Sequence, residues 1–312
     1  MAKKATALAI LELNCMPETV IDRTLWIART FDYNVHLVLF EPFSGALFGN
    51  LSVSSEADRI RREMVQTQHA IVEDYADRIR KEGVKVTTSI LDRRPLGDGI
   101  VELSDEISPR LVIKASQYHT AAQRSMLVDS DWQLLRICPQ PLWLVRAETM
   151  PEKPVVVAAV DPSHAHDKPA ALDHEIVRNS KVIAEKANGE LHLLHVYERL
   201  VGIGTAANRA INASKLPIDK IDERVKAEHR NALNALAMEC KVDIDRAHQL
   251  PGRADEIIPT FARSLGSGLV VLGALARWGL KRMIIGSTAE RVIDHISSDV
   301  LIVRLSDTQL YD

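Results

Sequence analysis

A pattern of 37 residues recurs in this chain, first as RLVIKASQYHTAAQRSMLVDSDWQLLRICPQPLWLVR (110–146) and again as GLVVLGALARWGLKRMIIGSTAERVIDHISSDVLIVR (268–304). The two copies align without a gap at an offset of 158 residues. Each copy reads as a branched apolar strand, a loop, a helix and a second strand that ends in Val-Arg. We interpret the pattern as an internal duplication.

Segments outside this pattern repeat as well. VHLVLFE (35–41) matches LHLLHVY (191–197), and Glu12 after the first apolar segment matches Asp161 in the second half. Apolar strands that alternate with helical segments are typical of parallel sheets covered on both faces. The sequence therefore predicts an α/β protein with two tandem five-stranded parallel-sheet domains, residues 1–147 and 154–312. The polar, proline-containing segment AETMPEKP (147–154) is the expected linker.

The apolar patterns also place the individual elements. We expect strands at 5–12, 34–40, 84–91, 110–115 and 142–146, and at 154–160, 190–197, 242–250, 268–273 and 300–304. Two long helices show apolar residues at helical spacing. Their expected buried faces are Ile60, Met64, Ile71, Tyr75 and Ile79 in one, and Ile218, Ile221, Val225, Leu233 and Leu236 in the other. The irregular segments 42–54 and 199–217 either cover a binding crevice or are mobile.

Composition limits the function classes. The net charge of −3 argues against a general nucleic-acid binder. The N-terminal MAKKATALAILEL is broken by Glu12 and reads as a strand rather than a signal peptide, and there is no apolar run of 18 residues to span a membrane. Cys15, Cys138 and Cys240 have no zinc spacing and suit a reducing compartment, so we expect a cytoplasmic protein.

A ligand site is expected in the second half. In open parallel sheets, ligands lie beyond the carboxyl ends of the strands, where the strand order reverses. Asp161 follows the first strand of this half, and the loop 273–288 follows its fourth strand. Asp161 is placed to accept hydrogen bonds from a ribose or an adenine amino group.

The loop itself has features of an anion site. Gly286 removes a Cβ where a phosphate would approach, and Gly273 lets the strand turn. Ser287 or Thr288 is the expected cap of a helix over 287–296 and offers a hydroxyl to an anion. The same residues also suit an ordinary bend between a strand and a helix, so spacing leaves both readings open.

The duplicated five-strand plan, the Val-Asp that ends the first strand of the second half, and the loop pattern G-x2-[G]-x9-G-[S/T] resemble the universal stress protein family. The resemblance covers nearly the whole chain and is close in DWQLLRICPQPLWLV and GSTAERVIDHISSDVLIV. It implies the tandem form of the family, an adenine nucleotide alpha hydrolase-like fold and the strand order 3-2-1-4-5. Some members of this family bind ATP and others do not, so the resemblance implies ATP as a possible ligand.

The family's ATP motif implies a set of contacts in the second half. It places Gly273, Ala276, Gly286 and Ser287 on the phosphates and Asp161 on the adenine. Ala276 departs from the glycine of the motif, and an alanine in the left-handed region costs roughly 1–2 kcal/mol. The expected ATP site is therefore weakened rather than abolished. The cations of the loop, Arg277, Lys281 and Arg282, either compensate or form a solvated face.

The first half differs at the corresponding positions and is expected to hold no cofactor. The two glycines and the serine are replaced by Ala115, Val128 and Asp129. Side chains therefore block the approach of an anion to the backbone, and a carboxylate lies at the expected start of the helix. Lys114 is unusual in an apolar run. We expect it to form a salt bridge with Glu12 where the ligand site once was.

Metal and catalytic sites find little support. The histidines of the second half have no standard metal spacing, and His192 and His195 point to opposite faces of a strand; the others are His164, His166 and His174. Ser116, Ser125 and Ser130 have no nucleophile-elbow glycines, and no P-loop or kinase signature is present. We therefore expect no catalytic residues and no metal.

Three functions follow as hypotheses. The first is a non-enzymatic cytoplasmic stress-response protein with a weak adenine-nucleotide site in the second domain. The second is a binding module for an apolar or mixed small ligand, and the third is a slow ATPase or adenylyl-transfer enzyme. The last strands, PLWLVR and VLIVRL, are the expected edges for pairing of the two halves, with homodimerisation of the whole chain left open. Neither nucleic acid nor a membrane is an expected partner.

Overall fold

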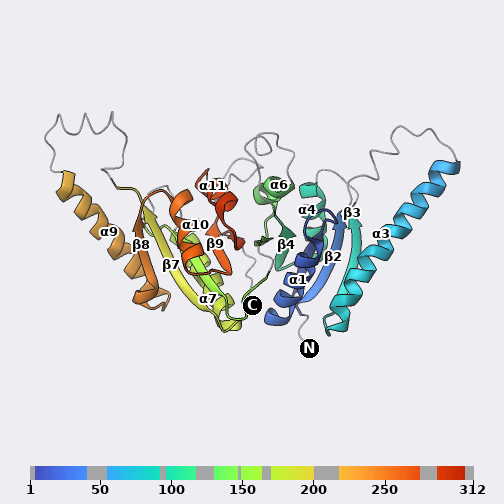
Figure 1. The fold of residues 1–312 in the computed structure, drawn as a ribbon, viewed down its shortest axis with the longest axis horizontal. Coiled ribbons are helices and arrows are strands. Elements are labelled where there is room, and N and C mark those ends of the chain that lie inside the picture. Colours follow the sequence, from blue (N-terminus) through green and yellow to red (C-terminus); the bar gives the residue numbers. More distant parts are fainter. Residues whose placement is uncertain are drawn as a thin grey trace. The chain divides into compact units, whose positions relative to one another are not determined.

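The structure, a computed structural model, describes residues 4–40, 55–91, 96–116, 130–146, 149–163, 170–199, 218–274 and 287–305. Contacts within the chain cluster into two compact units. The first contains the described residues up to Met150, and the second those from Pro151 to Leu305. Each unit is an α/β domain in its own right (Figure 1).

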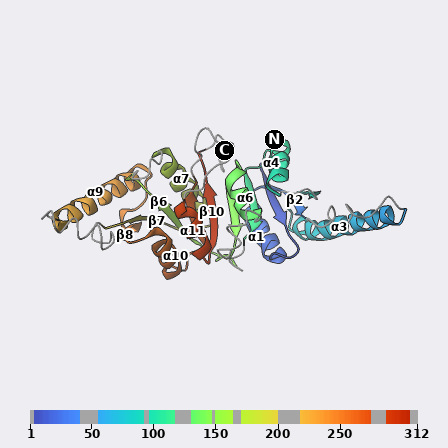
Figure 2. The ribbon, with the colours of Figure 1, turned by 90° about the horizontal axis from the view of Figure 1, so that it is seen from above.

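The first unit is a five-stranded parallel sheet in the order β3-β2-β1-β4-β5. The helix α1 contacts α3, and α4 contacts α6. Figure 2 shows α1 and α4 on opposite sides of this sheet. In chain order the elements are β1 (Thr6–Leu11), α1 (Pro17–Phe31), β2 (Asn34–Phe40), α3 (Ser55–Lys81), β3 (Val86–Leu91), α4 (Leu96–Ile107), β4 (Leu111–Ala115), α6 (Ser130–Ile137) and β5 (Leu142–Val145).

The second unit repeats this topology with the sheet order β8-β7-β6-β9-β10. Figure 2 shows α7 and α10 on opposite sides of the sheet. Its elements are β6 (Val155–Val160), α7 (Ala170–Lys186), β7 (Glu190–Tyr197), α9 (Ile218–Glu239), a 3₁₀ turn η2 (Ile244–Arg246), β8 (Ala247–Pro251), α10 (Ala254–Ser264), β9 (Leu269–Gly273), α11 (Ser287–His295) and β10 (Asp299–Val303). Both units therefore have the predicted strand order 3-2-1-4-5.

The central strands form the core of each unit because helices cover both faces of the sheet. Leu8 of β1 and Val112 of β4 are fully buried, as are Val157 of β6 and Val270 of β9. Trp143 of β5 is the largest of the fully buried side chains. The continuous apolar runs in the sequence thus correspond to strands that expose neither face to water.

One predicted strand was too long. The segment expected as a strand from 242 to 250 is extended as β8 only from Ala247, after the turn η2. The Asp243 carboxylate accepts the backbone N–H of Asp245 at 3.0 Å and caps this turn. A side chain that satisfies the backbone locally competes with strand pairing, and here the local bond prevails.

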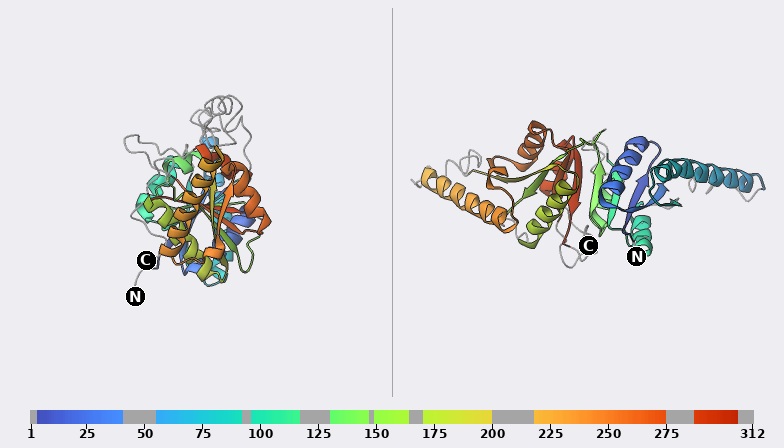
Figure 3. Two further views of the ribbon diagram at one scale, coloured as in Figure 1. Left: turned by 90° about the vertical axis from the view of Figure 1, so that its left-hand side faces the viewer. Right: turned by 90° about the horizontal axis from the view of Figure 1, so that it is seen from below.

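The two long helices are buried over less of their length than the apolar spacing predicted. Ile79 of α3 and Leu233 of α9 are fully buried, whereas Ile60 is 38% exposed and Ile221 is 37% exposed. The N-terminal part of each helix runs on past the edge of its own sheet (Figure 1; Figure 3, right). Beyond the sheet edge a helix has no strand of its own unit to pack against, which agrees with the exposure of Ile60 and Ile221.

None of the helices in the described part of the chain combines the length and the apolar character needed to cross a bilayer.

Candidate functional site

The candidate site lies at the carboxyl edge of the second sheet. Asp161 directly follows β6, and Gly273 is the last residue of the neighbouring strand β9. The order β8-β7-β6-β9-β10 makes the boundary between β6 and β9 the point where the strand order reverses. The predicted adjacency of the first and fourth strands of this half is thereby confirmed, and the convergence of Asp161 with the 273–288 loop stays a prediction.

Asp161 is held in a defined orientation. Its backbone N–H donates to Oδ1 of Asp173 on α7 at 2.9 Å, and its own Oδ1 accepts the Ser163 hydroxyl at 2.7 Å. Its side chain is 27% exposed. A carboxylate that is oriented by neighbours yet partly open to solvent is suited to accept hydrogen bonds from a ligand.

Gly273 has a packing reason to lack a side chain. It ends β9 beneath α7, and a Cβ at this position would lie 2.8 Å from Cδ1 of Ile176 and 2.9 Å from Cδ2 of Leu172. The sequence predicted that this glycine allows a turn and contacts a phosphate. The close approach of α7 explains it without a ligand, and contact with a phosphate stays a prediction.

The remainder of the predicted phosphate loop is only partly covered by the described residues. Ser287 and Thr288 begin α11, in agreement with the expected helix start. Ala276 and Gly286 lie outside the described residues, together with the loop cations Arg277, Lys281 and Arg282. The other predicted features outside them are Val128, Asp129, His164, His166 and the segments 42–54 and 200–217.

A histidine pair borders Asp161, and sequence reasoning did not find it. Nδ1 of His195 on β7 lies 3.2 Å from the carbonyl oxygen of Val160 and 3.9 Å from Oδ1 of Asp161. Nε2 of the same ring is 2.7 Å from Nδ1 of His229 on α9. The ring of Tyr197 lies alongside that of His229, with the centroids 5.2 Å apart. Burial lowers the pKa of His195.

Each of the two histidines has a position in the sequence that could have drawn attention to it, although neither position indicates the pairing. His195 interrupts the apolar run of its strand near the carboxyl end, and His229 lies one helical turn before the buried Leu233. The sequence pattern raised His195 only as a candidate metal ligand and gave no role to His229. Across the described residues, no group of three or more His, Cys, Asp or Glu side chains is arranged to hold a metal ion.

The first unit has an ion pair where the second has Asp161. Nζ of Lys114 lies 2.5 Å from Oε2 of Glu12 and donates to the carbonyl oxygen of Ala115 at 3.0 Å. The lysine side chain is 2% exposed and the glutamate side chain 14%. The predicted salt bridge is confirmed. A cation within the sheet, neutralised by the residue equivalent to Asp161, makes this edge chemically different from that of the second unit.

Together these features define a class of protein: two copies of a doubly wound α/β domain, with a polar group at each point where the strand order reverses. The chain belongs to the universal stress protein family, whose family model matches residues 15–146 and 154–304. It is a tandem member, with one family domain in each half.

Several relatives are similar over most of the chain. Universal stress protein E of Salmonella typhi is 28% identical over 255 residues, which are 81% of this chain and 79% of the relative. The universal stress protein E homolog of Haemophilus influenzae is 26% identical over 254 residues, 81% of each chain.

Solved structures show the same fold. A functionally unknown protein from Pseudomonas aeruginosa PAO1 has a TM-score of 0.70 at 24% identity, with 96% of this chain and 92% of that chain covered. A universal stress protein from Archaeoglobus fulgidus DSM 4304 has a TM-score of 0.60 at 16% identity, with 96% and 98% covered.

Family membership supports a role in the stress response, and members of this family are generally not enzymes. The pairing of the two halves through their last strands, the homodimer, the domain limits 1–147 and 154–312 and the cytoplasmic location stay predictions.

Proposed function

We propose that this chain is a non-enzymatic stress-response protein whose second unit binds an adenine nucleotide weakly at the edge formed by Asp161 and the 273–288 loop. The observation that carries the proposal is the position of Asp161, which is oriented by Ser163 and Asp173 at the reversal point of the sheet. The start of α11 at Ser287 supports it, because the first turn of a helix attracts anions.

The proposal assigns the first unit no nucleotide. Its equivalent edge carries the Glu12–Lys114 ion pair, which leaves a buried lysine already neutralised by a carboxylate. The asymmetry between the units supports one site per chain.

Titration calorimetry with ATP tests the proposal. The wild-type chain should bind weakly with a stoichiometry of one. Ala276→Gly should tighten binding by about tenfold, since it restores the glycine of the family motif. Asp161→Asn should weaken binding by about tenfold, since the amide presents a donor to a donor group.

Val128→Gly is the control in the first half, because it places a glycine at the position that aligns with Gly286 and should leave ATP affinity unchanged. ATP should be recovered intact after incubation. Absence of ATP binding to both wild type and Ala276→Gly would overturn the proposal. Native mass spectrometry that detects a co-purified apolar molecule instead would favour the ligand-binding module.

A further inference from the structure

The His195–His229 pair has a defined hydrogen-bond direction. The carbonyl oxygen of Val160 can only accept, so Nδ1 of His195 carries a proton and donates to it. Nε2 of the neutral His195 ring is then an acceptor. Nδ1 of His229 must therefore carry the proton of the 2.7 Å bond between the rings. Of the four ring nitrogens, only Nε2 of His229 then has a lone pair that is not used in these two hydrogen bonds.

This direction determines where the next proton enters. His195 is 1% exposed and already uses both nitrogens, whereas His229 on α9 is half-buried. A proton on Nε2 of His195 would set two donors against each other at 2.7 Å. A proton on Nε2 of His229 keeps the bond and makes it charge-assisted. The pair consequently accepts one proton while it remains intact.

The charged groups around the pair act in both directions. The carboxylates of Asp161 after β6 and Asp173 on α7 favour a positive charge there. Within one turn of His229 on α9, Lys226 and Arg230 oppose a positive charge and Glu228 favours it. The phenol of Tyr197 on β7 borders the rings. Burial lowers the pKa of His195, and the direction of the hydrogen bonds leaves Nε2 of His229 as the nitrogen that can accept a proton while the pair stays intact.

We propose that His195 and His229 form a one-proton site that couples binding of an anionic ligand at the Asp161 edge to pH, so that binding tightens as the pH falls. His229 carries the added charge. His195 accepts a hydrogen bond from His229 and donates one to the carbonyl oxygen of Val160, the residue before Asp161. This inference rests on the proposed function for its ligand but not for the behaviour of the pair.

Histidine NMR of the full-length chain without ligand tests the pair alone. The expected result is one titration shared by the two rings, with the proton added at Nε2 of His229 and Nδ1 of His195 protonated throughout. Protonation of His195 before His229, or two independent titrations near the ordinary histidine value, would overturn the proposal.

Calorimetry with ATP at pH 6.0 and 7.8 tests the coupling. Relative to His229→Gln, the wild type should gain about threefold more affinity on acidification, since one added charge acts across a partly solvated distance. The glutamine side chain of this variant retains a donor toward His195 but does not titrate. The comparison removes the protonation of ATP itself, which is common to both proteins.

His174→Gln is the matched control, because it removes a titrating histidine from the exposed surface of α7 in the same unit. It should keep the pH dependence of the wild type. Equal pH dependence in wild type and His229→Gln would overturn the coupling even if ATP binds. If ATP binds to neither protein, the coupling falls with the proposed function, and the NMR result then decides whether the one-proton pair exists.

Discussion

The Glu12–Lys114 pair shows how a single residue can change the character of a site. The lysine lies in β4, level with Ile10 of β1, and it is almost completely buried. In the second unit the position corresponding to Lys114 is Leu272, which leaves Asp161 without a lysine in β9. A charge inside a sheet is tolerated because the partner carboxylate is 2.5 Å away.

Glu12→Gln should lower the free energy of unfolding by about 3 kcal/mol, because the buried ammonium of Lys114 loses its carboxylate. The double variant Glu12→Gln/Lys114→Met should recover most of that loss, since it removes both charges. Urea unfolding of the single and double variants measures the difference. Equal losses in the two variants would contradict a cost that arises from the buried charge.

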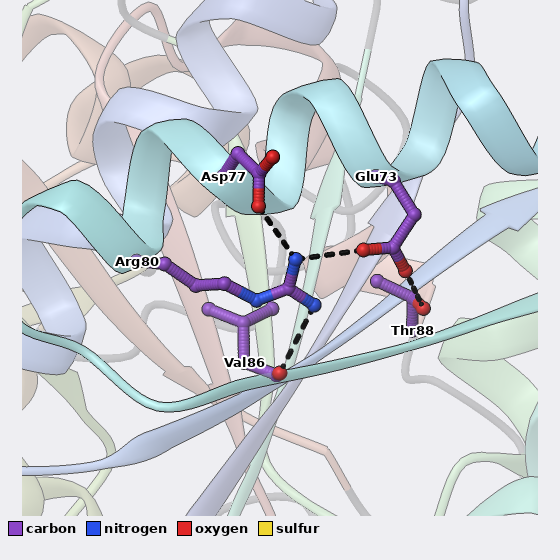
Figure 4. Close-up of polar contacts among 5 residues, drawn as sticks. All are labelled: Glu73, Asp77, Arg80, Val86 and Thr88. Carbon is purple, nitrogen blue, oxygen red and sulfur yellow. Dashed lines mark hydrogen bonds and ion pairs between the residues drawn. The ribbon is translucent and has the colours of Figure 1, made fainter.

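The helix α3 is attached to the edge strand β3 by a set of polar contacts (Figure 4). Nη1 of Arg80 lies 2.7 Å from both Oε2 of Glu73 and Oδ1 of Asp77, and Nη2 donates to the carbonyl oxygen of Val86 at 3.3 Å. The hydroxyl of Thr88 donates to Glu73. Because the other half of α3 runs past the sheet, these contacts concentrate the attachment at its C-terminal end.

Arg80→Ala should loosen this attachment and lower the free energy of unfolding by about 1 kcal/mol, the size expected for a partly exposed charge network. Hydrogen exchange should become faster in β3 and stay unchanged in β6. Arg224→Ala is the control, because Arg224 pairs with Glu228 on the exposed surface of α9. A faster exchange in both variants would show that the effect is not specific to the α3–β3 contact.

At the scale of the whole molecule, four histidines among the described residues have a pKa that burial lowers. His36 lies between the hydroxyls of Thr87 and Ser89, at 2.8 Å from each. The other three are His192, His195 and His248. His174 is the opposite case, since hydrogen bonds to the Ala170 carbonyl and Glu239 raise its pKa; its side chain is 44% exposed.

The sign of the resulting pH dependence follows by linkage. Below the ordinary histidine pKa of about 6.5, the unfolded chain binds protons that the four folded histidines resist, so acid favours unfolding. Their contribution is fully present above pH 6.5 and is lost as the pH falls through the folded pKa values. Each histidine contributes about 1.4 kcal/mol to the free energy of unfolding for every pH unit by which folding lowers its pKa.

Thermal unfolding between pH 8 and 5 should therefore show a constant midpoint near neutrality and a decline below about pH 6.5. His36→Gln should decline less steeply than the wild type, because one of the four proton-resisting groups is gone. His174→Gln should decline slightly more steeply, because a group that binds its proton better in the folded chain is gone. A midpoint that rises on acidification would contradict the assignment.

The linear order of residues was sufficient to predict the duplication, the alternation of strands and helices and the Glu12–Lys114 pair. A copied unit leaves a constant offset, and buried strands leave apolar runs, so both are visible without any contact being known. Lys114 was conspicuous because a cation inside such a run needs an anion nearby, and Glu12 ends a strand predicted to be its neighbour.

The other features of the structure depend on contacts between segments that are distant in the sequence. His195 and His229 are separated by 34 residues, and neither has a local pattern that assigns it to the other. The exposure of Ile60, and the need for glycine at position 273, depend on where a sheet ends and how closely α7 approaches it. Periodicity reports which face of an element is apolar, but burial depends on what lies opposite that face, which is a property of the packed chain.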